Sequence, residues 1–188
     1  DIPGEAAGTI PSPSTKQALV GEPWYPGDAV NMSIGQGAVT VTPIQIARMM
    51  ASIANGGTLM QPRLLLFAYE KDRRPQPGTP VVQRRDLYSD KTLAVLHEGL
   101  RIAVERGTGR ASNLKQVHVS GKTGSAENPR GKPHAWFAGF APSEAPRIVV
   151  VAFVEHGFRG GLASAPIVRR VLEAAFPARE ASGREAKP

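Results

Sequence analysis

The stretch from Ser120 to Glu127 combines a lysine with hydroxyl side chains and glycines. On a strand edge, the Lys122 ammonium and the Thr123 hydroxyl would together bind a substrate carboxylate. Gly124 has no side chain, so a substrate backbone can approach it closely. The backbone N–H of Ser125 can then point at a developing oxyanion. A Lys-Thr-Gly triplet also arises easily by chance, and an ordinary strand with one exposed lysine is the alternative interpretation.

Composition narrows the classes of function. The chain has 188 residues, no cysteine, 41% hydrophobic and 21% charged residues, and a formal net charge of +7. This is ordinary globular composition and excludes disulfides and thiolate chemistry. The basic residues are scattered without a nucleic-acid-binding signature, so we predict a solvated basic surface and no nucleic acid partner. Weak attraction to anionic lipid or wall polymer is the alternative. His134 and His156 lack ligand partners at metal spacing, so no metal or cofactor is expected.

The elements that position Lys122 are predicted to be strands. The first spans Val117–Glu127, and two more follow over His134–Ala141 and Arg147–Glu155. Short loops rich in Gly and Pro join them, which favours an antiparallel meander. Ile148–Val154 is apolar at every position, which is typical of a strand covered on both faces.

Helices are predicted to cover this sheet. They begin at capping residues Thr42, Ser89 and Ser164, and the last one ends at Phe176 and Pro177. The fold class is therefore α+β, an antiparallel sheet covered by helices, with one domain part over 1–177 and a flexible tail over 178–188. Three further predictions concern the rest of the chain. Residues 1–30 are predicted to be an ordered loop without helix, Leu64–Ala68 a short strand, and 71–86 a charged loop or ribbon.

Sequence blocks spread over residues 1–176 add a resemblance. In this order and spacing they resemble the C-terminal half of the transpeptidase domain of class B penicillin-binding proteins, specifically the elongation-type penicillin-binding protein 2 group. The Lys-Thr-Gly element itself is part of the signature of serine penicillin-recognising enzymes. The blocks are DIPGEAAG (1–8), WYPGDAVNMSIGQG (24–37), VTPIQIARMMASIANGG (41–57), GTGRAS (107–112), GKTGSAE (121–127), HAWFAGFAP (134–142) and ASAPIVRRVLEAAF (163–176).

The resemblance implies a partial transpeptidase fold, similar to serine β-lactamases, and a serine-type D,D-transpeptidase activity. In such enzymes a serine attacks the penultimate D-Ala carbonyl of a stem peptide, D-Ala leaves, and an amine of another stem resolves the acyl-enzyme. β-Lactams mimic the D-Ala-D-Ala end and trap the serine. Lys122 and Thr123 match the residues that bind the terminal carboxylate, and Ser125 matches the oxyanion position. The turn of Gly35, Gln36 and Gly37 matches a loop that shapes the cleft.

The family's Ser-x-x-Lys nucleophile and Ser-x-Asn element are expected N-terminal to Asp1. No Ser-x-Asn occurs in this chain. Ser112 and Lys115 do form a Ser-x-x-Lys pair, but Ser112 falls in a loop after a helix and too close to Lys122, whereas the family nucleophile opens a helix. We therefore expect no nucleophile in this chain, which alone would be inactive and poorly stable.

The resemblance also implies a setting for the full-length protein. This comprises a membrane anchor outside this chain, the periplasmic face of the bacterial inner membrane, and an elongation-machinery glycosyltransferase as partner. Two alternatives stay open. One is a non-catalytic wall-binding or scaffold relative of the same fold. The other is a β-lactamase or β-lactam sensor, which the blocks around residues 27–37 and 134–142 disfavour.

Overall fold

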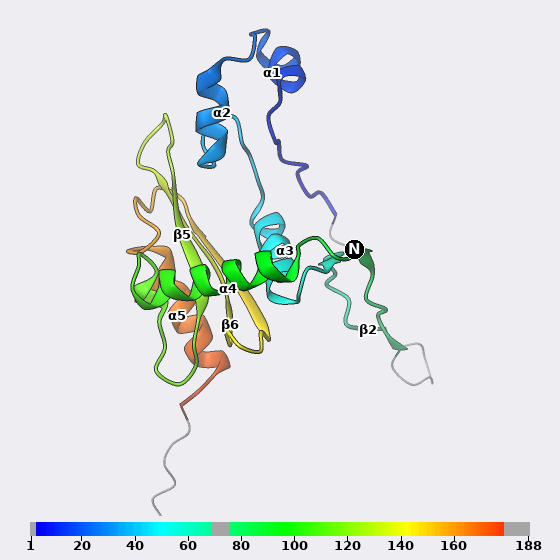
Figure 1. Ribbon diagram of the computed structural model, residues 1–188, viewed down its shortest axis with the longest axis vertical. Helices are drawn as coiled ribbons and strands as arrows, with labels where there is room; N and C mark the ends of the chain where they lie inside the picture. Colours follow the sequence, from blue (N-terminus) through cyan, green and yellow to red (C-terminus); the bar gives the residue numbers. More distant parts are fainter. Residues whose placement is uncertain (1–2, 69–75, 179–188) are drawn as a thin grey trace, which may run out of the picture.

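The computed structural model describes residues 3–68 and 76–178, with a three-stranded sheet near its centre (Figure 1). The strands are β5 (Ser120–Ala126), β6 (His134–Ala141) and β7 (Ile148–Val154), in the order β5-β6-β7. Both pairings are antiparallel, which confirms the predicted meander. Lys122 lies opposite Ala138 in this ladder, and Thr123 lies opposite Phe137. Because side chains alternate between the faces of a strand, Lys122 and Thr123 belong to opposite faces of the sheet.

Helices cover both faces of the sheet. On one face, α3 (Pro43–Ala54) and α4 (Asp90–Glu105) pack through Met50, Ile53 and Leu100 against Phe140. On the other face, α5 (Ser164–Ala175) packs through residues such as Val168 and Leu172 against Phe137. Phe137 and Phe140 are fully buried, so each face has its own apolar core.

The apolar run of β7 divides between these two cores. Val149 and Val151 pack with the α3 side, whereas Ile148, Val150 and Ala152 pack with the α5 side. The prediction of a strand covered on both faces is confirmed, because successive residues of β7 point alternately toward the α3 side and the α5 side.

Two of the three predicted helix caps are confirmed. The Thr42 hydroxyl accepts from Gln45 N–H, with Pro43 at the first helical position, and Ser89 accepts from Thr92 N–H. The Ser164 cap is wrong. Ala163 occupies the cap position in a helical conformation, and Ser164 N–H already donates to Gly160 O. Ser164 therefore lies inside the first turn, fully buried.

Residues 1–30 were predicted to be loop, and this is wrong. They contain α1 (Pro13–Val20) and the start of α2 (Pro26–Ser33). Ser12 caps α1 by accepting from Thr15 N–H, and both helices carry proline at a first helical position. A proline there loses no hydrogen bond, because that N–H has no partner within the helix. The two helices form an arm that extends away from the sheet (Figure 1).

Short ribbons lie on the other side of α3. The strand predicted over Leu64–Ala68 is limited to β2 (Phe67–Ala68), which pairs with β3 (Gln76–Pro77). An unpredicted strand, β1 (Leu59–Met60), pairs with β4 (Val82–Arg84). The predicted ribbon over 71–86 is thus found in its described part, while 71–75 and the tail 179–188 lie outside the described residues.

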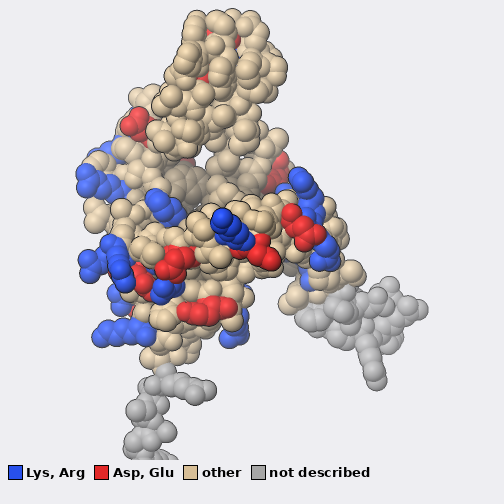
Figure 2. Space-filling view, in the orientation of Figure 1, with Lys and Arg blue, Asp and Glu red and all other residues tan. Residues whose placement is uncertain are grey.

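Charged side chains of both signs are interspersed over the body of the molecule on the face seen in Figure 2. Several pair along helices, as Arg101 does with Glu98 and Glu105 on α4 and Arg169 does with Glu173 on α5. This distribution agrees with a solvated basic surface rather than a concentrated basic patch. In the described part of the chain, no helix is long and apolar enough to cross a membrane.

Candidate functional site

The Lys-Thr-Gly element lies on β5, an outer strand of the sheet. Among the described residues no strand pairs with its far edge. The carbonyl of Ser125 accepts from a side chain at that edge, and the N–H and C=O of one residue in an antiparallel strand point the same way. The N–H of Ser125 and the backbone groups of Thr123 therefore also lie on the open edge. The Lys122 ammonium folds onto this edge and donates to Thr123 O at 2.7 Å.

A cleft of about 660 Å³ borders this edge. Its lining includes all four predicted site residues, Lys122, Thr123, Gly124 and Ser125, together with aromatic residues of β6 and β7 and the turn after α2. Trp136 and Phe153 contact each other within it, with tilted rings whose centroids are 4.4 Å apart. The size suits a small ligand or a short peptide end. The structure thus brings together the residues that the sequence singled out, in a cleft with an apolar wall.

Gln36 closes one end of the open edge. Its side-chain Nε2 donates to Ser125 O at 3.0 Å, and its Oε1 accepts from Glu127 N–H at 3.2 Å. Gly35 and Gly37 on either side both have φ of 73°, in the left-handed region that glycine adopts without strain. The side chain therefore imitates a paired strand and joins the arm to β5. The sequence predicted a cleft-shaping turn here but not this contact.

Thr123 also has a neighbour that sequence analysis did not single out. Thr108 Oγ1 lies 2.5 Å from Thr123 Oγ1, a hydrogen bond in which either oxygen can donate. Thr108 precedes the short 3₁₀ turn η1 (Arg110–Ser112), which connects α4 to β5. The GTGRAS block marked this segment, but nothing in its pattern indicated that Thr108 reaches β5.

Gly160 packs directly against the ladder beneath the site. A Cβ built on it would lie 2.1 Å from Trp136 O and 2.7 Å from Gly124 O. These atoms are backbone and cannot move independently of the sheet. Gly160 therefore permits the loop before α5 to sit against the β5–β6 pair at Gly124, where the site residues are held.

The other candidates behave differently. Ser112 is fully buried and its Oγ donates to Gly109 O at 2.7 Å, so it is not available as a nucleophile. His134 lines the cleft, and its Nδ1 accepts from the backbone N–H of His156. In the described part of the chain, no group of three or more His, Cys, Asp or Glu residues is arranged to bind a metal.

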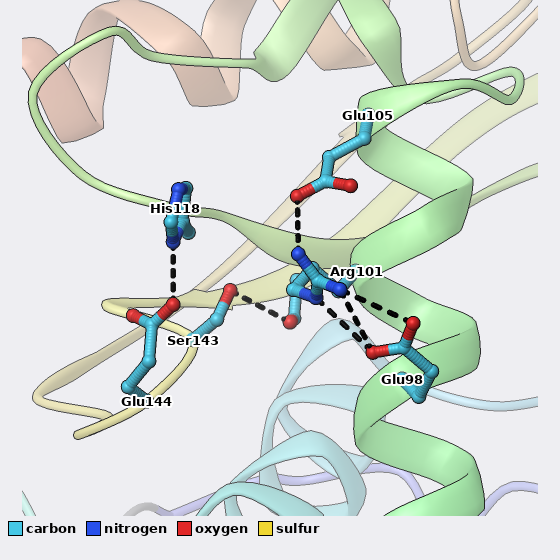
Figure 3. A network of polar contacts seen from close by, with 7 residues as sticks. Glu98, Arg101, Glu105, His118, Ser143 and Glu144 are labelled. Carbon is cyan, nitrogen blue, oxygen red and sulfur yellow. Dashed lines mark hydrogen bonds and ion pairs between the residues drawn. The ribbon is translucent and has the colours of Figure 1, made fainter.

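A polar network anchors the start of β5, away from the cleft (Figure 3). The buried Ser120 Oγ donates to Ser143 Oγ at 2.9 Å, and His118 Nδ1 lies 2.5 Å from Glu144 Oε1. The hydrogen bond from His118 lowers the pKa of the Glu144 carboxyl. Arg101 on α4 pairs with two glutamates of the same helix nearby. The contacts of Ser120 with Ser143 and of His118 with Glu144 join the start of β5 to the loop between β6 and β7.

An outer strand that carries Lys-Thr-Gly and borders a cleft agrees with one of the three elements of serine penicillin-recognising enzymes. Residues 1–173 match the model of the penicillin binding protein transpeptidase domain. The chain therefore belongs to the penicillin-binding protein transpeptidase family. The predicted fold class and the resemblance to the penicillin-binding protein 2 group are both confirmed.

Individual relatives support this. The peptidoglycan D,D-transpeptidase PbpA of Mycobacterium tuberculosis is 38% identical over 77% of this chain and 31% of its own length. The imipenem acyl-enzyme complex of penicillin-binding protein A from M. tuberculosis is similar with a TM-score of 0.69 and 38% identity, over 77% of this chain and 33% of that one. The complex between PBP2 and MreC from Helicobacter pylori gives a TM-score of 0.71 and 26% identity, over 93% and 32%.

The chain spans less than a third of the length of the curated relatives it matches, 27% in one and 31% in another.

Proposed function

We propose that this chain supplies the carboxylate-binding half of a peptidoglycan D,D-transpeptidase that cross-links stem peptides through a serine acyl-enzyme. The observation that carries the proposal is that Lys122, Thr123 and Ser125 all lie on the edge strand β5 and all line the cleft. Relatives that carry the name D,D-transpeptidase, and a relative described as an acyl-enzyme with a β-lactam, support it.

Each residue then has a role. The Lys122 ammonium and the Thr123 hydroxyl bind the terminal carboxylate of D-Ala-D-Ala or of a β-lactam. The substrate backbone lies along the edge of β5 as an added strand. The N–H of Ser125 donates to the carbonyl oxygen that becomes negative when the serine attacks. The serine comes from a segment of the full-length protein outside this chain, D-Ala leaves with a proton, and a stem-peptide amine takes over the acyl group.

The cellular setting is part of the proposal. Relatives are cell-wall synthesis enzymes, which agrees with a location on the periplasmic face of the inner membrane. The PBP2 of Helicobacter pylori was solved in complex with MreC, so that relative binds another protein. We extend this to a glycosyltransferase partner of the full-length protein, with residues 1–177 as one domain part.

Penicillin labelling tests the proposal. The full-length protein that contains this chain should form a covalent adduct with a fluorescent penicillin, on a serine located by mass spectrometry outside residues 1–188. Lys122→Met should reduce the second-order labelling rate by at least about tenfold, because a charge-assisted hydrogen bond contributes roughly 1.5–3 kcal/mol. Lys115→Met, which alters an exposed lysine, is the matched control.

Two results would contradict the proposal. A folded full-length protein that does not label would favour the non-catalytic wall-binding relative. An adduct on a residue of this chain would contradict the assignment of the nucleophile to another segment.

A further inference from the structure

Thr108 and Thr123 bring two hydroxyl groups together at the edge of the site. Their oxygens are 2.5 Å apart, and the two residues come from different elements, the loop after α4 and strand β5. Thr123 belongs to the sheet face that α5 covers, since it lies opposite Phe137. Thr108 therefore approaches Thr123 from the α5 side of β5.

The backbone around Thr108 is fixed by close packing. Gly109 N–H donates to Ala103 O at 2.9 Å, which ties the segment to the end of α4. A Cβ on Gly107 would lie 2.8 Å from Ala103 O, and a Cβ on Gly161 would lie 2.6 Å from Thr108 O. Both approaches need glycine, because the atoms met are backbone. The hydroxyl of Thr108 is thus presented to β5 by a segment wedged between α4 and the loop before α5.

Proton counting decides what this contact does when a carboxylate is bound. Each hydroxyl has one proton to donate and can accept from others. A carboxylate accepts only, so Thr123 must turn its own proton toward it. The Thr108–Thr123 hydrogen bond can then persist only if Thr108 donates its proton to Thr123 Oγ1. A hydroxyl that accepts one hydrogen bond also becomes a better donor in the next.

The geometry points to Thr108 as a positioning residue that sets carboxylate specificity: by donating to Thr123 Oγ1, it holds the Thr123 hydroxyl as the donor to the ligand's terminal carboxylate. This inference rests on the proposed function and adds to it a residue that supports the Lys-Thr-Gly element through Thr123. Thr108 does not contact the ligand and acts through Thr123. Its removal should therefore weaken the response to ligands with a free carboxylate and leave ligands without one unaffected.

The test is penicillin acylation of the full-length protein that contains this chain, with a penicillin free acid and its methyl ester compared under the same conditions. Thr108→Val keeps the shape of the side chain but removes the hydroxyl. We expect it to lower the acylation rate constant for the free acid by about three- to tenfold, the scale of one hydrogen bond. The rate for the ester should stay within about twofold of wild type, a change below half a hydrogen bond. Thr108→Ser should restore the free-acid rate.

Two further variants separate the possible explanations. Thr108→Val in a Thr123→Val background should have no additional effect, because the acceptor is gone. Thr92→Val removes a hydroxyl from another exposed hydroxyl pair, with Ser89 at 2.9 Å, and should alter neither rate. An unchanged free-acid rate in Thr108→Val, or an equal loss with acid and ester, would overturn the inference. Absence of labelling in the wild type would instead refute the proposed function.

Discussion

Replacing Gln36 with alanine tests whether a side chain really substitutes for a paired strand at the site. Gln36 donates to Ser125 O at 3.0 Å and accepts from Glu127 N–H at 3.2 Å. A hydrogen bond contributes a net of about 0.5–1.5 kcal/mol, so the pair contributes about 1–3 kcal/mol. Gln36 is half-buried and water can replace part of both contacts. We therefore expect a local loss near the lower end, about 1–1.5 kcal/mol.

Amide hydrogen exchange measures this loss directly. In Gln36→Ala, the Glu127 amide should exchange about ten times faster, since about 1.4 kcal/mol corresponds to a factor of ten. Amides in the β5–β6 ladder should change little, because their partners are on β6. Gln116→Ala is the matched control, since Gln116 also bonds a backbone carbonyl, that of Phe176, away from the cleft. Glu127 protection within twofold of wild type would refute the role given to Gln36.

Three further substitutions have defined outcomes in the full-length protein. Gly160→Ala should lower the penicillin acylation rate at least tenfold and destabilise the protein by about 1–3 kcal/mol, because its Cβ would collide with Trp136 O; a wild-type rate and melting temperature would show that the loop moves freely. Ser164→Ala should be neutral or stabilise by about 1 kcal/mol in urea unfolding, because the buried Ser164 Oγ has no hydrogen-bond partner among the described residues; a clear loss would reveal one. Asp28→Asn should destabilise α1–α2 at neutral pH. The hydrogen bond from Lys16 lowers the pKa of Asp28, so this stabilisation is complete above the ordinary value of 3.8 and disappears as the pH falls through the lower, folded-state pKa. A difference in hydrogen exchange that persisted in strong acid would contradict this.

The sheet was predictable from local pattern because each strand carries its own signal. His134–Ala141 was predicted with its observed bounds, and the apolar run of β7 indicated two covered faces before any partner was known. The observed β5 is shorter than the predicted Val117–Glu127, because its ladder with β6 begins at Ser120 and ends at Ala126. Which residues of β7 face which core depends on the helices that cover the sheet. Two of these helices, α3 and α4, begin at the predicted capping residues Thr42 and Ser89.

The wrong predictions involve proline and serine, which occur both in loops and at the first positions of helices. Pro13 and Pro26 occupy first helical positions, as Pro43 does, but they lie in the stretch 1–30 for which the sequence predicts a loop. The apolar periodicity that supported Pro43 is weaker in the short helices of the arm. Ser164 resembles a cap in sequence, but helical hydrogen bonding from Gly160 begins before it.

That the candidate site residues would line one cleft could be predicted from the sequence, but the residues that surround them could not. Lys122, Thr123 and Ser125 are close in the chain, so the edge of a single strand carries all three, although Lys122 and Thr123 belong to opposite faces of the sheet. Gln36 and Thr108 reach β5 across 89 and 15 residues of chain respectively, from segments whose own patterns indicate only turns. Such contacts depend on how α2, α4 and α5 pack, which no local spacing specifies.

The Gln36 contact also sets how far the sheet can grow. An open strand edge invites any extended segment to pair with it, including the same edge of another molecule. Gln36 already occupies Ser125 O and Glu127 N–H. An incoming chain can therefore form backbone hydrogen bonds with β5 only as far as the N–H of Ser125. Pairing along this edge therefore has a fixed end point. It admits the end of a short peptide, while the long continuous pairing that would propagate into aggregates is interrupted.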